Sequence, residues 1–100
     1  MNKELLRSLT TKEIDTYHRD GVLLLKNMFD EDWIKLLNKG LDFNCKYPTE
    51  RSRIWNKDAE ERSMFYDTLA WRKIKEYKKF IYDSPAAQIC GQLMKATTVN

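Results

Sequence analysis

The chain has 100 residues, which is enough for one small domain with a thin core. Its apolar fraction of 42%, charged fraction of 33% and aromatic fraction of 12% are typical of a folded soluble protein and argue against disorder. The 18 basic and 15 acidic residues leave a net charge of +3, and because the two signs are interleaved, this balance does not predict a nucleic-acid partner.

Neither a membrane span nor an export signal is predicted. The longest apolar run, from Val22 to Leu25, is far shorter than the roughly 20 residues that a membrane-spanning helix needs. The segment from Met1 to Arg7 contains no apolar signal-peptide core. Cys45 and Cys90 lack metal-binding spacing, and Cys90 lies on the apolar face of a predicted helix, which favours a buried free thiol. We therefore expect a cytoplasmic protein.

The first helix is predicted to start at Thr10 and to stop at Gly21. Thr10 and Glu13 have the spacing of a capping box, and glycine is the residue most often found just past the end of a helix. The four apolar residues that follow are too few for a helix, so we predict a buried strand from Val22 to Lys26.

A second helix is predicted to begin after Asp30. Asp30 is a favourable N-cap, and the acidic residues Glu31 and Asp32 suit the positive end of the helix dipole. The residues at helical spacing that we expect to form its buried stripe are Trp33, Ile34, Leu37 and Leu41.

The helical pattern is lost between Phe43 and about Glu60, so residues 44–60 are predicted to form a long surface loop. Loops of this length in compact domains are often functional. Arg51, Arg53 and Trp55 are an unusual mixture for a simple linker, and we take them as candidate substrate-binding residues.

Two further helices are predicted in the last third of the chain. The first runs from about Glu61 to Tyr82, with a break near Leu69. Ser84 as N-cap and Pro85 at the first helical position predict the start of the second. The β-branched residues 97–99 are predicted to begin another strand. The apolar residues at helical spacing in the last helix are Ala86, Ile89, Cys90, Leu93, Met94 and Thr97.

The residue inventory excludes several chemistries. His18 is the single histidine, so an iron site of the two-histidine, one-carboxylate type cannot be assembled from this chain. We expect His18 to be a surface or half-buried residue at a helix end. The three glycines are isolated, which excludes a phosphate-binding glycine loop, and no nucleophile-elbow sequence is present. We therefore expect no catalytic residue and no metal ligand within these 100 residues.

A basic cluster lies in the third predicted helix beside several aromatic residues. One interpretation is a helix that binds a membrane surface or a partner protein. The interpretation that we prefer is a solvated face whose lysine stems cover the aromatic rings, because Glu76 and Asp83 interrupt the positive charge. The basic residues are Arg72, Lys73, Lys75, Lys78 and Lys79.

The chain resembles the N-terminal part of the phytanoyl-CoA dioxygenase family in three ordered stretches. The first is Leu9-Thr10 followed by Tyr17-His18-Arg19-Asp20-Gly21-Val22. The second is Phe29-Asp30 with Trp33, Ile34 and Leu37. The third comprises Phe65, Asp67, Trp71, Phe80-Ile81, Ser84-Pro85-Ala86-Ala87, Leu93-Met94 and Val99-Asn100.

This resemblance implies a specific fold and activity for the parent protein. Members of the family fold as a double-stranded β-helix, a cupin-like jelly roll, with flanking helices. They use Fe(II) and 2-oxoglutarate to hydroxylate an organic substrate. Their metal ligands and cosubstrate-binding arginine lie downstream of the matched region, so none is carried over to this sequence. Phe65 and Trp71 are matched positions and join the candidate substrate-binding residues.

We therefore expect an α+β chain that is mostly helical, forming one incomplete domain over residues 1–100. It would be the N-terminal flank of a jelly-roll oxygenase, truncated before the core strands and inactive by itself. Two alternatives remain open. The chain could be a free-standing helical interaction module without catalysis, in which the apolar run packs irregularly among helices. It could also belong to a relative that has lost its activity.

Overall fold

The computed structural model describes residues 1–56, 58 and 63–100. Within these residues the chain is α+β, with four α-helices, one short 3-10 helix and one two-stranded antiparallel sheet. The elements are α1 (Thr11–Asp20), α2 (Glu31–Lys46), β1 (Ser52–Trp55), β2 (Met64–Asp67), η1 (Ala70–Arg72), α3 (Lys75–Asp83) and α4 (Ala86–Met94).

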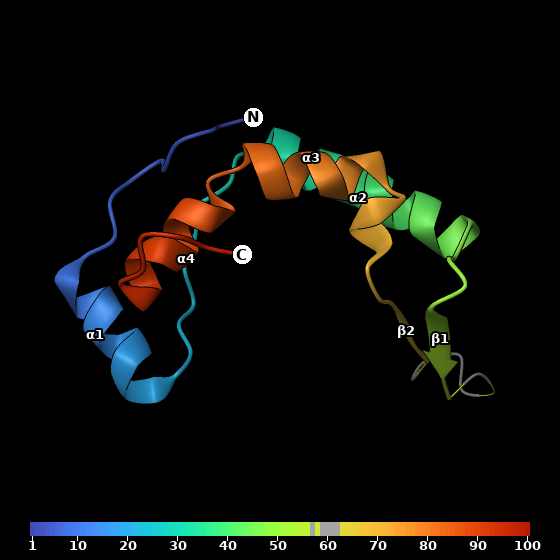
Figure 1. Cartoon of the computed structure of the whole chain (residues 1–100), viewed down its shortest axis with the longest axis horizontal. Coiled ribbons are helices and arrows are strands. Elements are labelled where there is room, and N and C mark those ends of the chain that lie inside the picture. Colours follow the sequence, from blue (N-terminus) through green and yellow to red (C-terminus); the bar gives the residue numbers. More distant parts are fainter. Residues whose placement is uncertain (57, 59–62) are drawn as a thin grey trace.

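The molecule is elongated. Helices α2 and α3 lie side by side in its middle, the β1–β2 hairpin lies at one end, and α1 and α4 lie at the other (Figure 1). The extents are 45 × 28 × 24 Å, and the radius of gyration is 16.0 Å. A compact domain of this length has a radius of gyration of about 13 Å. The chain therefore exposes more of its surface than a spherical fold would.

The predicted boundaries of the first helix are confirmed by its caps. The Thr10 hydroxyl accepts a hydrogen bond from the Glu13 amide at 3.1 Å, and the Glu13 carboxylate accepts one from the Thr10 amide at 3.0 Å. Arg7 extends this box with two hydrogen bonds to Glu13, each 2.8 Å long. At the other end Gly21 has a φ of 73°, a left-handed conformation that glycine adopts without steric cost.

The predicted buried strand from Val22 to Lys26 is wrong. The segment has no strand partner among the described residues, because the single sheet there lies at the far end of the molecule. Val22 and Leu24 are 71% and 77% exposed, whereas Leu23 and Leu25 are half-buried. Alternate side chains of an extended segment point in opposite directions, so one side of this run is covered and the other faces solvent.

The core lies where the N-terminal residues, α2 and α3 meet. Trp33 is 1% exposed, and its indole N–H donates a hydrogen bond of 2.6 Å to the Asn2 carbonyl. Asn2 and the predicted N-cap Asp30 also bond each other through backbone N–H groups and side-chain oxygens. The Phe80 ring packs edge-on against the Trp33 ring at 5.6 Å and at a tilt of 51° against the Phe29 ring at 5.2 Å. Of the predicted stripe, Ile34 and Leu41 are exposed instead.

Helices α2 and α3 approach most closely at Gly40, which is buried. A Cβ atom at this position would lie 2.9 Å from Tyr77 Cε1 and 3.0 Å from Glu76 Cβ. Real Cβ atoms essentially never lie as close as the first of these distances, so a larger residue would force the Tyr77 ring or the helices themselves to shift.

The predicted loop at 44–60 and the helix predicted from Glu61 are both corrected in part. Helix α2 continues to Lys46, and β1 pairs with β2 so that Arg53 faces Tyr66 and Trp55 faces Met64. The hairpin was missed because four-residue strands show too short an alternation of apolar and polar residues to be recognised among so many charged residues. Residues 57 and 59–62 lie outside the described residues. The break near Leu69 is confirmed, since Leu69 has a φ of 59° immediately before η1.

The last helix is confirmed, although its start lies one residue later than predicted. Pro85 is the N-cap, and the Ser84 hydroxyl accepts a hydrogen bond from the Ala86 amide at 3.3 Å. The strand predicted at 97–99 is wrong, because the chain turns back at Lys95 and the Ala96 amide bonds the Gly91 carbonyl at 2.9 Å. Cys90 is a free thiol, as predicted, but it is half-buried and not buried.

The substitution Gly40→Ala is expected to destabilise the fold. Overpacking at the α2–α3 crossing costs about 1–3 kcal/mol, and the better helix propensity of alanine recovers at most about 1 kcal/mol. Chemical denaturation followed by circular dichroism measures the change. Asn38→Ala, on the exposed face of the same helix, is the matched control and should be neutral or slightly stabilising. Equal stability of both variants would contradict a tight crossing.

The Glu13 carboxylate should titrate well below an ordinary glutamate. The hydrogen bonds from Arg7, and then those from Thr10, lower the pKa of Glu13 to about 2. Because this folded-state pKa is depressed, the stabilisation is present above the ordinary pKa and is lost as the pH falls toward 2. Carboxyl NMR titration measures the value. Arg7→Gln should raise the pKa of Glu13, and an unchanged value would contradict the pairing.

Candidate functional site

The hairpin positions three of the five candidate substrate-binding residues. Side chains alternate between the two faces of a strand, and those of directly paired residues share a face. The register Arg53↔Tyr66 and Trp55↔Met64 therefore gathers Arg53 and Trp55 on one face of the sheet. Phe65, paired with Ile54, belongs to the opposite face. The structure thus brings together Arg53 and Trp55 and separates both from Phe65.

The arginine and aromatic face of the hairpin is open to solvent. Trp55 is 55% exposed, and Tyr66 and Met64 are also exposed. The Arg53 guanidinium donates a hydrogen bond of 2.8 Å only to its neighbour, the Ser52 carbonyl, among the described residues. Such a face can stack on a planar group, but it encloses no volume in which a small molecule would be sheltered from water.

The remaining two candidates lie away from that face. Arg51 belongs to the turn before β1 and lines a small groove of about 180 Å³ together with Arg72 and Lys73. Trp71 lies in η1, where its ring is 6.4 Å from the Tyr82 ring and 5.7 Å from the Arg72 guanidinium carbon. Trp71 is therefore held among α3 residues and does not join the hairpin residues.

Asp67 is the most heavily bonded side chain of this region, although sequence reasoning assigned it no role. Its carboxylate accepts hydrogen bonds of 2.8 Å from the Asn44 side chain and from the Thr49 amide, and a further one from the Thr49 hydroxyl. These bonds fasten the hairpin to the end of α2. Asp67 was noted only as a position matched by the family resemblance, because its partners lie 18 and 23 residues away.

The Asp67 carboxylate is held in its charged form. Burial raises the pKa of Asp67, but the hydrogen bonds from Thr49 and Asn44, helped by the nearby Lys73 charge, outweigh that effect and leave the pKa below its ordinary value. Lys73 itself forms an ion pair of 2.6 Å with Glu50. This network explains why the 47–51 segment lies against β2 and η1.

An apolar groove of about 700 Å³ lies where η1, α3, α4 and the C-terminal residues meet. Trp71, Phe80 and Tyr82 form one side, and Cys90 and Val99 are among the residues on the other. The groove offers the Cys90 thiol, the Tyr82 phenol and the Asn100 amide, but no acidic, histidine or lysine side chain among its lining residues. It is suited to covering an apolar segment and not to acid–base chemistry.

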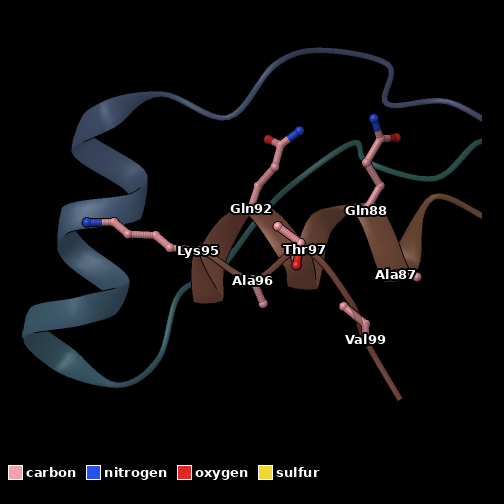
Figure 2. A pocket seen from close by; sticks show the side chains of 8 residues that line it. Ala87, Gln88, Gln92, Lys95, Ala96, Thr97 and Val99 are labelled. Carbon is pink, nitrogen blue, oxygen red and sulfur yellow. The ribbon is translucent and has the colours of Figure 1, made fainter.

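A second groove of about 520 Å³ lies along α4 and the returning C-terminal segment (Figure 2). Gln88 and Gln92 project on one side of α4, and Lys95 points toward α1. Val99 lies near Gly91, where an added Cβ would be 3.3 Å from the Ala96 carbonyl oxygen and 3.7 Å from Val99 Cγ2. The lining holds one charged group and therefore no acid–base pair.

No metal centre is found in the described part of the chain. No group of three or more histidine, cysteine or acidic residues gathers there. His18 is exposed on α1 with its ring edge-on to Tyr17 at 5.7 Å, and Cys45 and Cys90 are both free thiols. Among the helices of residues 1–56, 58 and 63–100, none combines the length and apolar character that crossing a bilayer requires.

Comparison with models of protein families, with curated proteins and with solved structures finds no match to this chain.

The substitution Asp67→Asn should loosen the attachment of the hairpin. It removes the charge that the Thr49 and Asn44 donors stabilise, so we expect a loss of about 1 kcal/mol in the free energy of unfolding at neutral pH. Because the folded-state pKa of Asp67 is depressed, the wild type should lose this contribution as the pH falls below the ordinary aspartate value, and the variant should show a flatter acid limb.

Denaturation midpoints measured between neutral and acidic pH test this expectation. Asp42→Asn, on an exposed position of α2, is the matched control. If both variants show the same pH dependence, Asp67 does not anchor the hairpin.

Proposed function

We propose that this chain is the N-terminal helical flank of a non-haem dioxygenase that resembles the phytanoyl-CoA dioxygenase family. The parent enzyme would use Fe(II) and 2-oxoglutarate to hydroxylate a small organic substrate in the cytoplasm. The observation that carries the proposal is the extended segment Val22–Leu25, which is covered on one side and open on the other. It follows the helix and glycine stop at which the family resemblance begins.

An extended apolar segment of this kind is unstable in isolation. Its backbone N–H and C=O groups need partners, and two short strands are the least that a sheet can contain. The described residues supply no neighbouring strand for it. A jelly-roll sheet in the parent protein would supply that neighbour and would also cover Val22 and Leu24.

The exposed apolar surface supports the same proposal. The groove that contains Trp71 and Val99 has apolar walls, and the outer surface of a jelly-roll sheet must be covered by other elements. The family resemblance assigns this covering role to the helices that precede the core strands. Helices α3 and α4 have the position in the chain that this role requires.

The residues of this chain do not fit an iron site. It has one histidine, and its described acidic residues do not gather around a common centre. The iron ligands and the cosubstrate arginine of the proposal therefore belong to the remainder of the parent protein, and this chain performs no chemical step. Arg53 and Trp55 on the open hairpin face remain candidates for contact with the substrate. Phe65 lies on the opposite face of the sheet, and Arg51 and Trp71 lie outside the sheet.

The two free thiols support a reducing compartment.

A helical interaction module is the second candidate. It is favoured by large apolar side chains that stay exposed in pairs on two sides of α2 and its C-terminal turn, since exposed apolar surface can mark contact sites. These residues are Ile34, Leu41, Phe43 and Tyr47. The two candidates differ in one respect that can be measured, because only the first requires an oxygenase in the parent protein.

The deciding experiment measures the Fe(II)-dependent conversion of 2-oxoglutarate to succinate. It is performed on this chain and on the protein translated from the extended reading frame, in which a His-x-Asp motif is expected soon after Asn100. We expect turnover only in the longer protein, and loss of that turnover when the histidine of the motif is replaced by alanine.

Other results would overturn the proposal. Absence of the motif, or no turnover in a folded longer protein that binds iron, would favour the interaction module. Turnover by the 100-residue chain alone would contradict the exclusion drawn from its single histidine.

A further inference from the structure

The basic cluster of the third predicted helix is divided by the structure into two groups. Arg72 lies over Trp71, and Lys73 is paired with Glu50. The other three lysines line a groove of about 710 Å³ between α2 and α3, together with Lys39 from the facing helix. We call it the lysine groove, and its lining residues are Leu36, Lys39, Lys75, Glu76, Lys78, Lys79, Tyr82 and Asp83.

Two of the four ammonium groups are already engaged. Lys79 Nζ lies 2.7 Å from Asp83 Oδ2 and 6.0 Å from the centre of the Trp33 ring. Lys39 Nζ is the cation nearest to Glu76, at 4.0 Å. Lys75 and Lys78 form no ion pair with a described residue, and they lie three positions apart on α3, so they project from neighbouring points of one helical face.

Glu76 is the unusual member of the groove. Its side chain is only 7% exposed, yet no described residue donates a hydrogen bond to its carboxylate. The distance of 4.0 Å to Lys39 is too long for a hydrogen bond. Its Cβ lies at the helix crossing, 3.0 Å from the position that a Cβ on Gly40 would take. No buried side-chain oxygen of the described residues lacks a hydrogen-bond partner, so the Glu76 oxygens open onto the groove and can accept a hydrogen bond from a ligand there.

We propose that the lysine groove binds a phosphorylated polyol, with the phosphate between Lys75 and Lys78 and a hydroxyl group donating a hydrogen bond to Glu76. Ammonium groups are common phosphate ligands in proteins. The side chains of Leu36 and Tyr82 offer apolar surface to the carbon skeleton of the polyol. The proposal is independent of the oxygenase function, since it uses residues on a different surface from the hairpin.

Simpler ligands complement either the lysines of the groove or Glu76, but not both. Inorganic phosphate would pair with the lysines but would be repelled by the Glu76 carboxylate. A metal ion or an amine would pair with Glu76 but would be repelled by four ammonium groups. A molecule that carries both an anionic phosphate and a neutral hydroxyl donor complements both sets of residues.

The test compares ligands that differ by one group. Titrations of the 100-residue chain with inositol 1-phosphate, with inorganic phosphate and with inositol are followed by amide NMR and calorimetry. We expect inositol 1-phosphate to bind at least tenfold more tightly than either of the other two ligands, with shifts centred on α3. Equal affinity for inositol 1-phosphate and inorganic phosphate would overturn the proposal.

A vesicle assay distinguishes a lipid headgroup from a soluble metabolite as the natural ligand. Phosphatidylcholine vesicles with and without phosphatidylinositol 4-phosphate are used in a sedimentation assay. Binding that needs the phosphorylated lipid would assign the groove to a lipid headgroup, and binding of the free compound alone would assign it to a soluble metabolite. Binding of neither the vesicles nor the free compound would overturn the proposal.

Variants locate the site. The double change Lys75→Gln with Lys78→Gln should weaken inositol 1-phosphate binding at least tenfold. The matched control, Lys12→Gln with Lys26→Gln, removes the same charge from exposed positions away from the groove and should weaken it less than twofold. Equal losses in both double variants would indicate nonspecific charge attraction and would overturn the proposal.

Glu76→Gln gives an outcome that misfolding cannot imitate. It should weaken the binding of inositol 1-phosphate about threefold, because a neutral acceptor forms a weaker hydrogen bond than a carboxylate. It should strengthen the binding of inorganic phosphate, because a repulsive charge is removed. A damaged fold would weaken both ligands, so weakening of both, or no change in either, would contradict the role of Glu76.

Discussion

The structure depends on the close crossing of α2 and α3. Gly40 allows the two helix backbones to approach, and at one end of the contact the aromatic rings of Trp33, Phe80 and Phe29 pack together. The N-terminal residues are fastened to the same place through Asn2. The hairpin is attached to this pair of helices through Asp67, and α4 through the Ser84–Pro85 junction, while α1 packs against α4. A chain with so few buried residues has little other means of holding its parts together.

The sequence predicted both ends of the first helix and the start of the second, because caps are local. Thr10, Gly21 and Asp30 each act on backbone groups within a few residues of themselves, so their roles follow from spacing alone. The hairpin was missed because strand pairing is not local. Its pairs join residues up to 15 positions apart, such as Ser52 with Asp67, and four-residue strands carry too weak an alternation to be recognised among charged neighbours.

In the candidate site, too, local features were predicted and features that depend on distant residues were not. Arg53 and Trp55 were singled out because their residue types are unusual in a loop, and the register then placed them on one face. No local pattern could reveal that Asp67 anchors the hairpin or that Glu76 lies beside Gly40, since both depend on partners from α2. The Val22–Leu25 segment was predicted to be a buried strand, but it forms no strand, and Val22 and Leu24 are exposed. Its hydrophobicity indicates that it needs a cover, but does not say where that cover comes from.

The three tryptophans lie at three different depths, and this has a practical consequence for spectroscopy. Trp33 is enclosed, Trp71 is half-buried against α3, and Trp55 is open to solvent on the hairpin. The fluorescence of the native protein is therefore a sum of one blue-shifted, one intermediate and one red-shifted emission. A soluble quencher should remove the red component first, and each tryptophan replaced by phenylalanine would isolate the behaviour of one region. Because the Trp33 indole bonds the Asn2 carbonyl, the blue component also reports whether the N-terminal residues are docked.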